Sequence, residues 1–104
     1  MIVRRISDWG LEDRLAVDGG PLVVHFMESD GRMADIRRYE FRRVAREHPE
    51  VAFLEVDLLE NPSLAGRYSI SATPVVLVFI RGVEAVRHVG GRLEETVGKI
   101  LGPC

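Results

Sequence analysis

Three apolar runs, each about as long as one β-strand, are the feature that most constrains this fold. They cover residues 22–27, which only His25 interrupts, residues 51–57, and the run that opens at Ser71 and ends at Ile80. A continuous apolar run, such as residues 22–27, indicates a central strand that is buried on both faces of a sheet, and the other two runs are also typical of strands. Such strands need helices on each side, so the segments between the runs decide the fold class.

Helix-type segments separate these runs. Residues 33–47 carry apolar side chains at i, i+3, i+4 and i+7 spacing, which predicts an amphipathic helix. Its apolar positions are Phe41, Val44, Ala45 and His48. Asn61 and Pro62 suit the cap and first position of a second, shorter helix that continues to Tyr68.

The two ends of the chain add edge strands and further helices. Residues 2–6 predict a short edge strand, and Ser7–Asp8 begin a helix that contains Trp9. Residues 83–89 form a hairpin with the preceding run, and a last helix follows at residues 92–101. Strands separated by helices pair in parallel, while the hairpin adds an antiparallel edge. We expect one α/β domain over residues 1–104, with a mixed central sheet flanked by helices on both faces.

Composition excludes several classes of function. The net charge is −2 at pH 7, so neither nucleic acid nor an anionic membrane is an expected partner. The longest apolar run, residues 74–80, is too short for a membrane span, and the first residues contain no apolar stretch of signal-peptide length. We therefore expect a cytoplasmic protein. The histidines and acidic residues show no metal-ligand spacing, so no metal or other cofactor is predicted.

Six arginines lie between residues 32 and 46. They are Arg32, Arg37, Arg38, Arg42, Arg43 and Arg46. Acidic residues are interleaved with them. Aromatic side chains on which bases could stack, a common feature of single-strand nucleic-acid binding, do not accompany them. This pattern predicts a solvated helix face with i, i+4 ion pairs. Arg32 is different because it lies in the loop before the helix, where it either contacts a carboxylate of a partner or is simply exposed.

Segments of this chain resemble the thioredoxin family, in order and without gaps from about residue 22 to residue 101. LVVHF resembles the family's central strand, which usually reads LVVDF, and FLEVD resembles its third strand. SATPVVLVFIRGVEAVRHVGG resembles the strand that begins at the family's cis-proline, followed by its glycine hairpin. The resemblance implies a thioredoxin-like fold over most of the chain.

The resemblance places the family's redox motif, W-C-G-P-C, on a segment without cysteine. That segment is Asp30, Gly31, Arg32, Met33 and Ala34. Gly31 and Ala34 fall on the two cysteine positions, and a shift by one residue puts Asp30 and Met33 there instead. Dithiol–disulfide exchange needs an attacking thiolate and a resolving thiol. The resemblance therefore carries over the fold but not the reaction.

Other positions of the resemblance leave two interpretations each. His25 falls where the family has a buried aspartate, and is either a titratable group that couples the loop to pH or a core histidine with one hydrogen bond. We favour the second, because no partner residue is evident. Thr73–Pro74 falls on the family's cis-proline, which either docks an extended peptide or only shapes the fold. Met33 either offers an adaptable apolar contact there or packs inward.

We predict a redox-inactive module that binds another protein or an extended peptide segment. The predicted surface combines residues 30–34, Thr73, Pro74 and Gly90. Thioredoxin-like proteins without the cysteine pair are known among assembly chaperones, which this chain resembles. Two alternatives remain: a monothiol oxidoreductase that uses Cys104, the single cysteine, and a structural or oligomerisation domain. The expected state is a monomer or a weak dimer.

Overall fold

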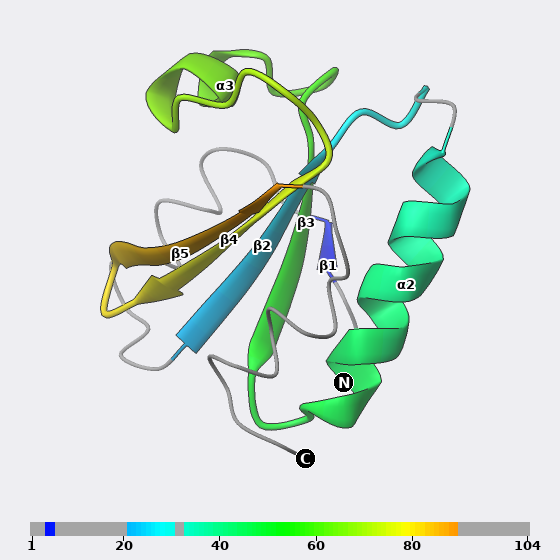
Figure 1. Ribbon diagram of the computed structural model, residues 1–104, viewed down its shortest axis with the longest axis vertical. Helices are drawn as coiled ribbons and strands as arrows, with labels where there is room; N and C mark the ends of the chain where they lie inside the picture. The colour runs from blue at the N-terminus through cyan, green and yellow to red at the C-terminus, as the bar shows by residue number, and fades with distance from the viewer. Residues whose placement is uncertain (1–3, 6–20, 31–32, 90–104) are drawn as a thin grey trace.

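A five-stranded mixed sheet forms the centre of the protein (Figure 1). The structure is a computed structural model that describes residues 4–5, 21–30 and 33–89. Its strands are β1 (Arg4–Arg5), β2 (Pro21–Met27), β3 (Ala52–Asp57), β4 (Val75–Ile80) and β5 (Val83–Val89). Its helices are α2 (Ala34–Glu47) and α3 (Ser63–Arg67). The strand order across the sheet is β1-β3-β2-β4-β5.

The pairing of the strands confirms the predicted mixed α/β sheet. β3 runs parallel to both β1 and β2, whereas β4 runs antiparallel to β2 and to β5. The turn between β4 and β5 has positive φ at Arg81 (54°) and at Gly82 (79°). Positive φ at both central residues suits the tight turn of a hairpin, and glycine adopts it without steric cost.

The observed boundaries differ most from the prediction at the start of β4. The run predicted to open at Ser71 becomes a strand only at Val75. Pro74 has no N–H to donate to a strand ladder, so the ladder begins after it. The predicted first helix with Trp9 and the predicted last helix lie outside the described residues.

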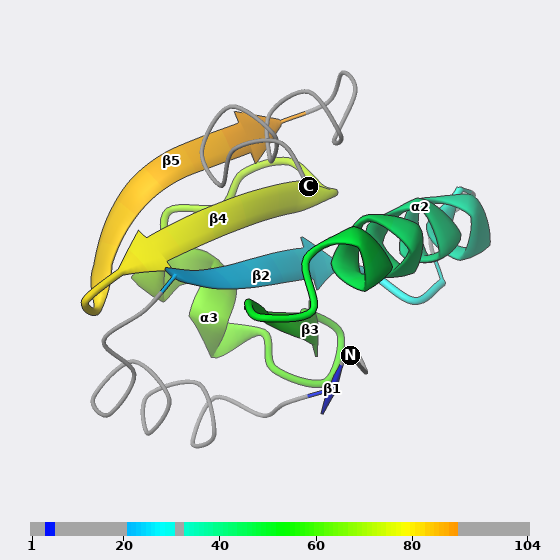
Figure 2. The same ribbon diagram turned by 90° about the horizontal axis from the view of Figure 1, so that it is seen from below.

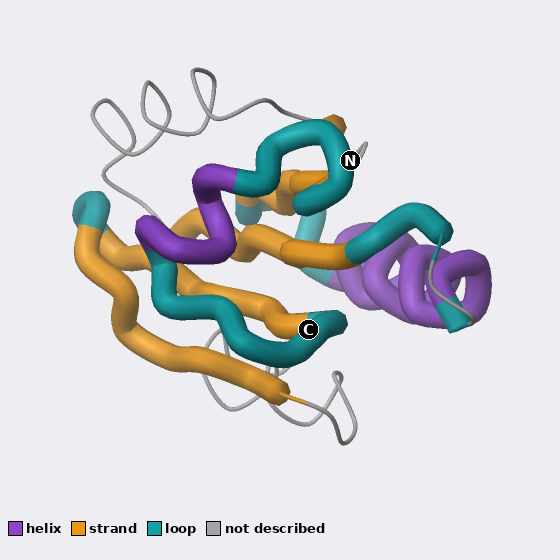
Figure 3. Tube along the Cα trace, turned by 90° about the horizontal axis from the view of Figure 1, so that it is seen from above, coloured by secondary structure: helices purple, strands orange, loops and turns teal. Residues whose placement is uncertain are grey.

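The central strand β2 sends alternate side chains to two different cores, as the period of a strand requires. Val24 and Phe26 belong to a cluster with Leu64 of α3, whereas Val23 belongs to a cluster with Phe41 of α2. The two helices therefore cover opposite faces of the sheet, and Figures 2 and 3 show them well apart. We call these faces the α3 face and the α2 face.

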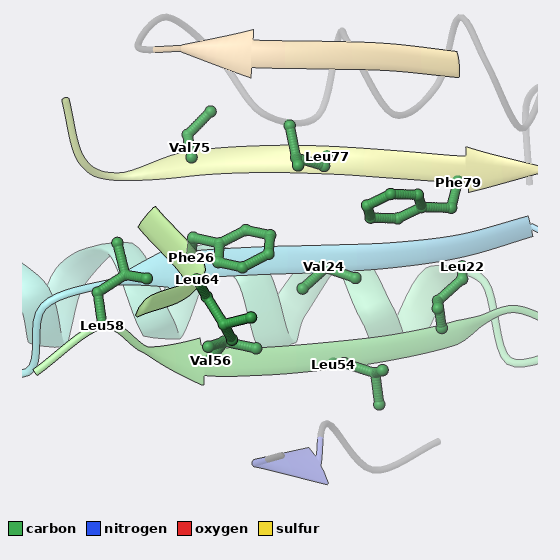
Figure 4. Close-up of a cluster of buried hydrophobic side chains, with 10 residues drawn as sticks. All are labelled: Leu22, Val24, Phe26, Leu54, Val56, Leu58, Leu64, Val75, Leu77 and Phe79. Atoms are coloured by element: carbon green, nitrogen blue, oxygen red, sulfur yellow. The ribbon is translucent and has the colours of Figure 1, made fainter. Parts of the chain in front are cut away.

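The α3 face is built from aliphatic and aromatic side chains (Figure 4). Its buried residues are Leu22, Val24, Phe26, Leu54, Val56, Leu58, Leu64, Val75, Leu77 and Phe79. The Tyr68 ring packs at this face, 5.6 Å from Phe26 and 5.8 Å from Phe79 between ring centroids.

One arginine of β5 fastens the hairpin to the end of α3. Arg87 donates hydrogen bonds to the backbone oxygens of Tyr68, at 2.6 Å, and Ser69, at 2.9 Å. Its Nε and Nη2 also donate to the carboxylate of Glu84. The hydrogen bond from Arg87 lowers the pKa of Glu84, so this carboxylate stays charged and holds the guanidinium in place.

Candidate functional site

A groove of about 270 Å³ opens between the end of β2, the start of α2 and the segment before β4. Its apolar lining consists of Met27, Met33, Ala34 and Pro74. Its polar lining consists of Glu28, Arg37 and Thr73. Two neighbouring segments, residues 27–28 and 33–37, thus meet a third that is distant in sequence, residues 73–74, because β4 pairs with β2.

The loop that leaves β2 is anchored to the end of β3. Asp57 is only 3% exposed, and its Oδ1 accepts hydrogen bonds from the backbone N–H groups of Ser29, at 3.3 Å, and Leu59, at 3.0 Å. Hydrogen bonds from backbone N–H groups to a carboxylate are stronger than bonds between neutral groups. The loop therefore starts from a fixed position beside the groove.

A side-chain hydrogen bond joins two walls of the groove. Thr73 Oγ1 donates to Glu28 Oε1 at 2.8 Å, which links the loop after β2 to the segment before β4. The peptide bond between Thr73 and Pro74 is cis. The Glu28 carboxylate is thus held over the groove by the threonine hydroxyl.

The first turn of α2 forms the third wall. Met33 occupies the N-cap position and makes no side-chain cap hydrogen bond, and its carbonyl accepts the Arg37 N–H at 3.0 Å. The Met33 side chain is 48% exposed, while Ala34 beside it is buried. Of the two interpretations of Met33, the structure supports an accessible thioether in the groove rather than an inward-packed one.

Arg37 projects from the same turn, three residues after Ala34. Its Nη1 lies 3.5 Å from Glu40 Oε2, an i, i+3 ion pair between half-exposed side chains. Its Nε is buried and has no hydrogen-bond partner among the described residues. Arg37 therefore combines a solvated end with a shielded donor close to the groove.

His25 lies two residues before Met27 on β2 and is 2% exposed. Its ring packs 4.8 Å from the ring of Phe41, between centroids, and its buried Nδ1 has no partner within the described part of the chain. His25 is thus a core histidine, as predicted, and Nδ1 is not the nitrogen that makes the predicted hydrogen bond. Burial, with added repulsion from Arg38 and Arg37, lowers the pKa of His25 to about 4, so the ring is neutral at pH 7.

Glu55 of β3 stands beside His25 in the parallel ladder and is fully buried. Its Oε1 accepts a hydrogen bond from Arg38 Nε at 3.1 Å and lies 3.7 Å from Arg42 Nη2. The sequence predicted a solvated face for both arginines, and this is wrong for Arg38, which reaches inward to Glu55, whereas the Arg42 side chain is 46% exposed. The sequence did contain a signal for this pairing. Glu55 lies in a strand of the predicted sheet, which helices flank on both faces, and a buried carboxylate needs a cationic partner.

The structure brings together only some of the predicted site residues. Met33, Ala34, Thr73 and Pro74 all line the groove, whereas Asp30 is exposed and does not. Gly31, Arg32, Gly90 and Cys104 lie outside the described residues. The sequence analysis did not assign Met27, Glu28 and Arg37 to the site. Their positions next to the strand end and one helical turn after Ala34 were the available signals.

The described residues contain neither a cluster suited to a metal ion nor a membrane-spanning helix. No group of three or more histidine, cysteine, aspartate or glutamate side chains in that part could hold a metal ion. No helix there is both long and apolar enough to cross a membrane.

The strand order, the helices on opposite faces and the groove at the end of the central strand define a thioredoxin-like α/β fold. The X-ray structure of Fasciola hepatica thioredoxin superposes with a TM-score of 0.81 at 25% identity, covering 96% of each chain. The structure of a designed protein gives a TM-score of 0.83 at 23% identity, with 96% of this chain and 98% of that chain covered.

Sequence relatives agree with the fold, although no protein-family profile matches the chain. A "Thioredoxin H-type" protein of Fagopyrum esculentum is 30% identical over 97 residues, which cover 91% of this chain and 83% of the relative. The "Thioredoxin-like protein CXXS1" of Oryza sativa subsp. japonica is 28% identical over 100 residues, which cover 95% of this chain and 74% of the relative. The chain belongs to the thioredoxin family.

Proposed function

We propose that this protein is a redox-inactive member of its family that binds an extended segment of another protein, as a binding module or assembly chaperone. The observation that carries the proposal is the groove, in which Met33 and Ala34 face Thr73 and Pro74. We further propose that it acts in the cytoplasm, as a monomer or weak dimer.

The chemistry of the segment at residues 30–34 supports the absence of dithiol exchange. The chain has one cysteine, Cys104, so this segment provides neither an attacking thiolate nor a resolving thiol. A serine, Ser29, stands nearby, but its backbone N–H is held by Asp57, and no histidine lines the groove to activate a hydroxyl.

The lining of the groove supports binding of a peptide side chain. Two methionines, an alanine and a proline provide apolar surface, and the half-exposed Met33 can adapt its rotamer to different partners. The groove is bounded by Thr73, which precedes the proline at the start of β4. A peptide extended along this segment would place its side chains alternately toward and away from the groove.

The test is affinity capture from a lysate under reducing conditions, followed by mass spectrometry. Thr73→Arg fills the groove, whereas Ser71→Arg adds the same side chain at an exposed position outside the lining. We expect one partner to be retained by the wild type and by Ser71→Arg and lost by Thr73→Arg. Equal recovery with all three proteins would move the binding site elsewhere.

An insulin-reduction assay tests the redox part separately. We expect no turnover by the wild-type protein. Turnover that Cys104→Ser abolishes would overturn redox inactivity and favour the monothiol alternative.

A further inference from the structure

Glu28 and Arg37, the two charged side chains that line the groove, differ in the hydrogen bonds that their polar atoms make. Glu28 Oε1 accepts the Thr73 hydroxyl at 2.8 Å. Arg37 places Nη1 near Glu40, at 3.5 Å, but its Nε is shielded from solvent and has no acceptor in the described ranges. A donor shielded from water without an acceptor is unfavourable. Arg37 is therefore the groove residue that gains most from an acceptor brought by a ligand.

A second shielded polar atom lies behind the groove. His25 is 2% exposed, and it follows the same strand face as Met27, which lines the groove. Its Nδ1, like Arg37 Nε, has no hydrogen-bond partner among the described residues. Arg38 and Arg37 both lie close enough to this ring to repel its protonated form, so two cations are near the back of the groove. Because Glu55 takes the hydrogen bond of Arg38, Arg37 is the cation that a ligand meets.

This inference rests on the proposed function and specifies the bound segment. We propose that this segment carries an aspartate or glutamate beside an apolar residue, with the apolar side chain against Met27, Met33 and Pro74 and the carboxylate on Arg37. Because Glu40 engages Nη1, the carboxylate of the ligand would bind the other edge of the guanidinium, formed by Nη2 and by Nε, which has no acceptor among the described residues. That edge matches the two oxygens of a carboxylate.

The acidic residues near the groove restrict where the carboxylate of a ligand can bind. Asp30 and Asp35 are exposed and lie outside the groove lining, so solvent and salt screen their repulsion. Glu28 lines the groove and accepts the Thr73 hydroxyl, so the carboxylate of the ligand is assigned to the wall formed by the first turn of α2, where Arg37 lies. Arg37 instead has a donor shielded from water, which makes its interaction with a bound charge stronger.

The experiment measures the binding of fluorescein-labelled peptide mixtures by anisotropy. Each mixture has a central leucine, degenerate outer positions, and one flanking residue fixed as Asp, Glu, Asn, Gln, Lys or Arg. We expect the wild type to bind acidic mixtures about tenfold more tightly than the matched amide mixtures, the effect of one charge-assisted hydrogen bond. Arg37→Gln should abolish this difference.

Matched variants separate the role of Arg37 from general charge and from folding. Arg46→Gln removes the same charge from an exposed position at the far end of α2 and should keep the preference. Arg37→Glu should reverse it toward lysine mixtures, which a merely unfolded variant would not do. The His25 ring gives an independent signal, because a carboxylate bound nearby should raise its pKa from about 4 in NMR titrations.

The outcomes distinguish this inference from the function on which it rests. If Thr73→Arg abolishes all binding, the groove is the binding site. If the wild type then binds acidic and amide mixtures equally, or binds lysine mixtures more tightly, the preference for acid is overturned. Acidic preference that survives Arg37→Gln would equally overturn the assignment. Absence of binding by every mixture would reject both the peptide groove and its acidic occupant.

Discussion

The α3 face and the α2 face of the same sheet differ in the kind of side chains that they bury. The α3 face is closed by leucine, valine and phenylalanine side chains. The α2 face also buries a histidine, His25, and a glutamate, Glu55, which pairs with Arg38 of the helix above it. Buried polar groups cost free energy that apolar packing does not. The comparison therefore separates a face that stabilises the fold from a face that positions charges behind the groove.

The largest expected effect tests the α3 face. Phe26→Ala removes a fully buried ring that packs near Tyr68, so we expect the free energy of unfolding to fall by about 4 kcal/mol. Denaturant unfolding followed by circular dichroism measures it. Ile36→Ala, at a side chain that is 50% exposed, is the control and should change stability little. If Phe26→Ala lowers the free energy of unfolding by no more than Ile36→Ala does, the α3 face is not the main source of stability.

The second prediction concerns pH and the α2 face. His25 binds its proton near pH 4 in the folded chain and near pH 6.5 when unfolded. The unfolded chain therefore binds more protons between these values, and stability rises with pH across this window. We expect His25 to contribute a loss of about 3 kcal/mol between pH 7 and pH 4.

The His25→Phe variant isolates this contribution. Urea unfolding at several pH values should show a shallower decline in stability below pH 6.5 than for the wild type. An unchanged slope would mean that His25 is not shielded in the folded state.

The third prediction removes the buried charge of the α2 face. Glu55→Gln leaves Arg38 with a weaker acceptor in a partly buried site, and we expect a loss of about 2 kcal/mol. The double variant Glu55→Leu/Arg38→Leu should recover most of it, since apolar residues often replace a buried ion pair at little cost. Thermal unfolding of the three proteins measures both effects. If the double variant is less stable than Glu55→Gln, the charges contribute more than packing could.

The smallest expected effect lies at the rim of the groove. Thr73→Val removes the hydrogen bond to Glu28 at an exposed position, so we expect a loss of about 0.5 kcal/mol. Glu28→Gln keeps an acceptor and should cost less. Chemical denaturation at pH 7 measures both. A large loss from Thr73→Val would assign the bond to the fold and not to the groove.

The sequence predicted the strands and the long helix well because their apolar periodicity reflects burial on the sheet. The segment predicted as residues 33–47 is observed as Ala34–Glu47, and residues 83–89 form β5 as expected. His48 is buried and its ring lies 6.3 Å from that of Phe53, which confirms its place on the apolar face.

The partners of charged side chains were harder to predict. Nothing local in the sequence separates Arg38, which reaches Glu55, from Arg37, which borders the groove, although the two are neighbours. Their different environments follow from the rotation of 100° per residue along the helix relative to the sheet. Likewise, the bond between Glu28 and Thr73 joins residues 45 positions apart, and only the fold brings them together.

Arg87 links the β4–β5 hairpin to the end of α3. Because its guanidinium holds the carbonyl groups of Tyr68 and Ser69 at the end of α3, opening of the β4–β5 hairpin must release that end as well. In native-state hydrogen exchange, the amides of β5 and those of the last turn of α3 should therefore exchange with a shared opening free energy. This shared opening would connect the sheet edge to the segment that leads into Thr73, so local unfolding at one end of the molecule would reach the groove at the other.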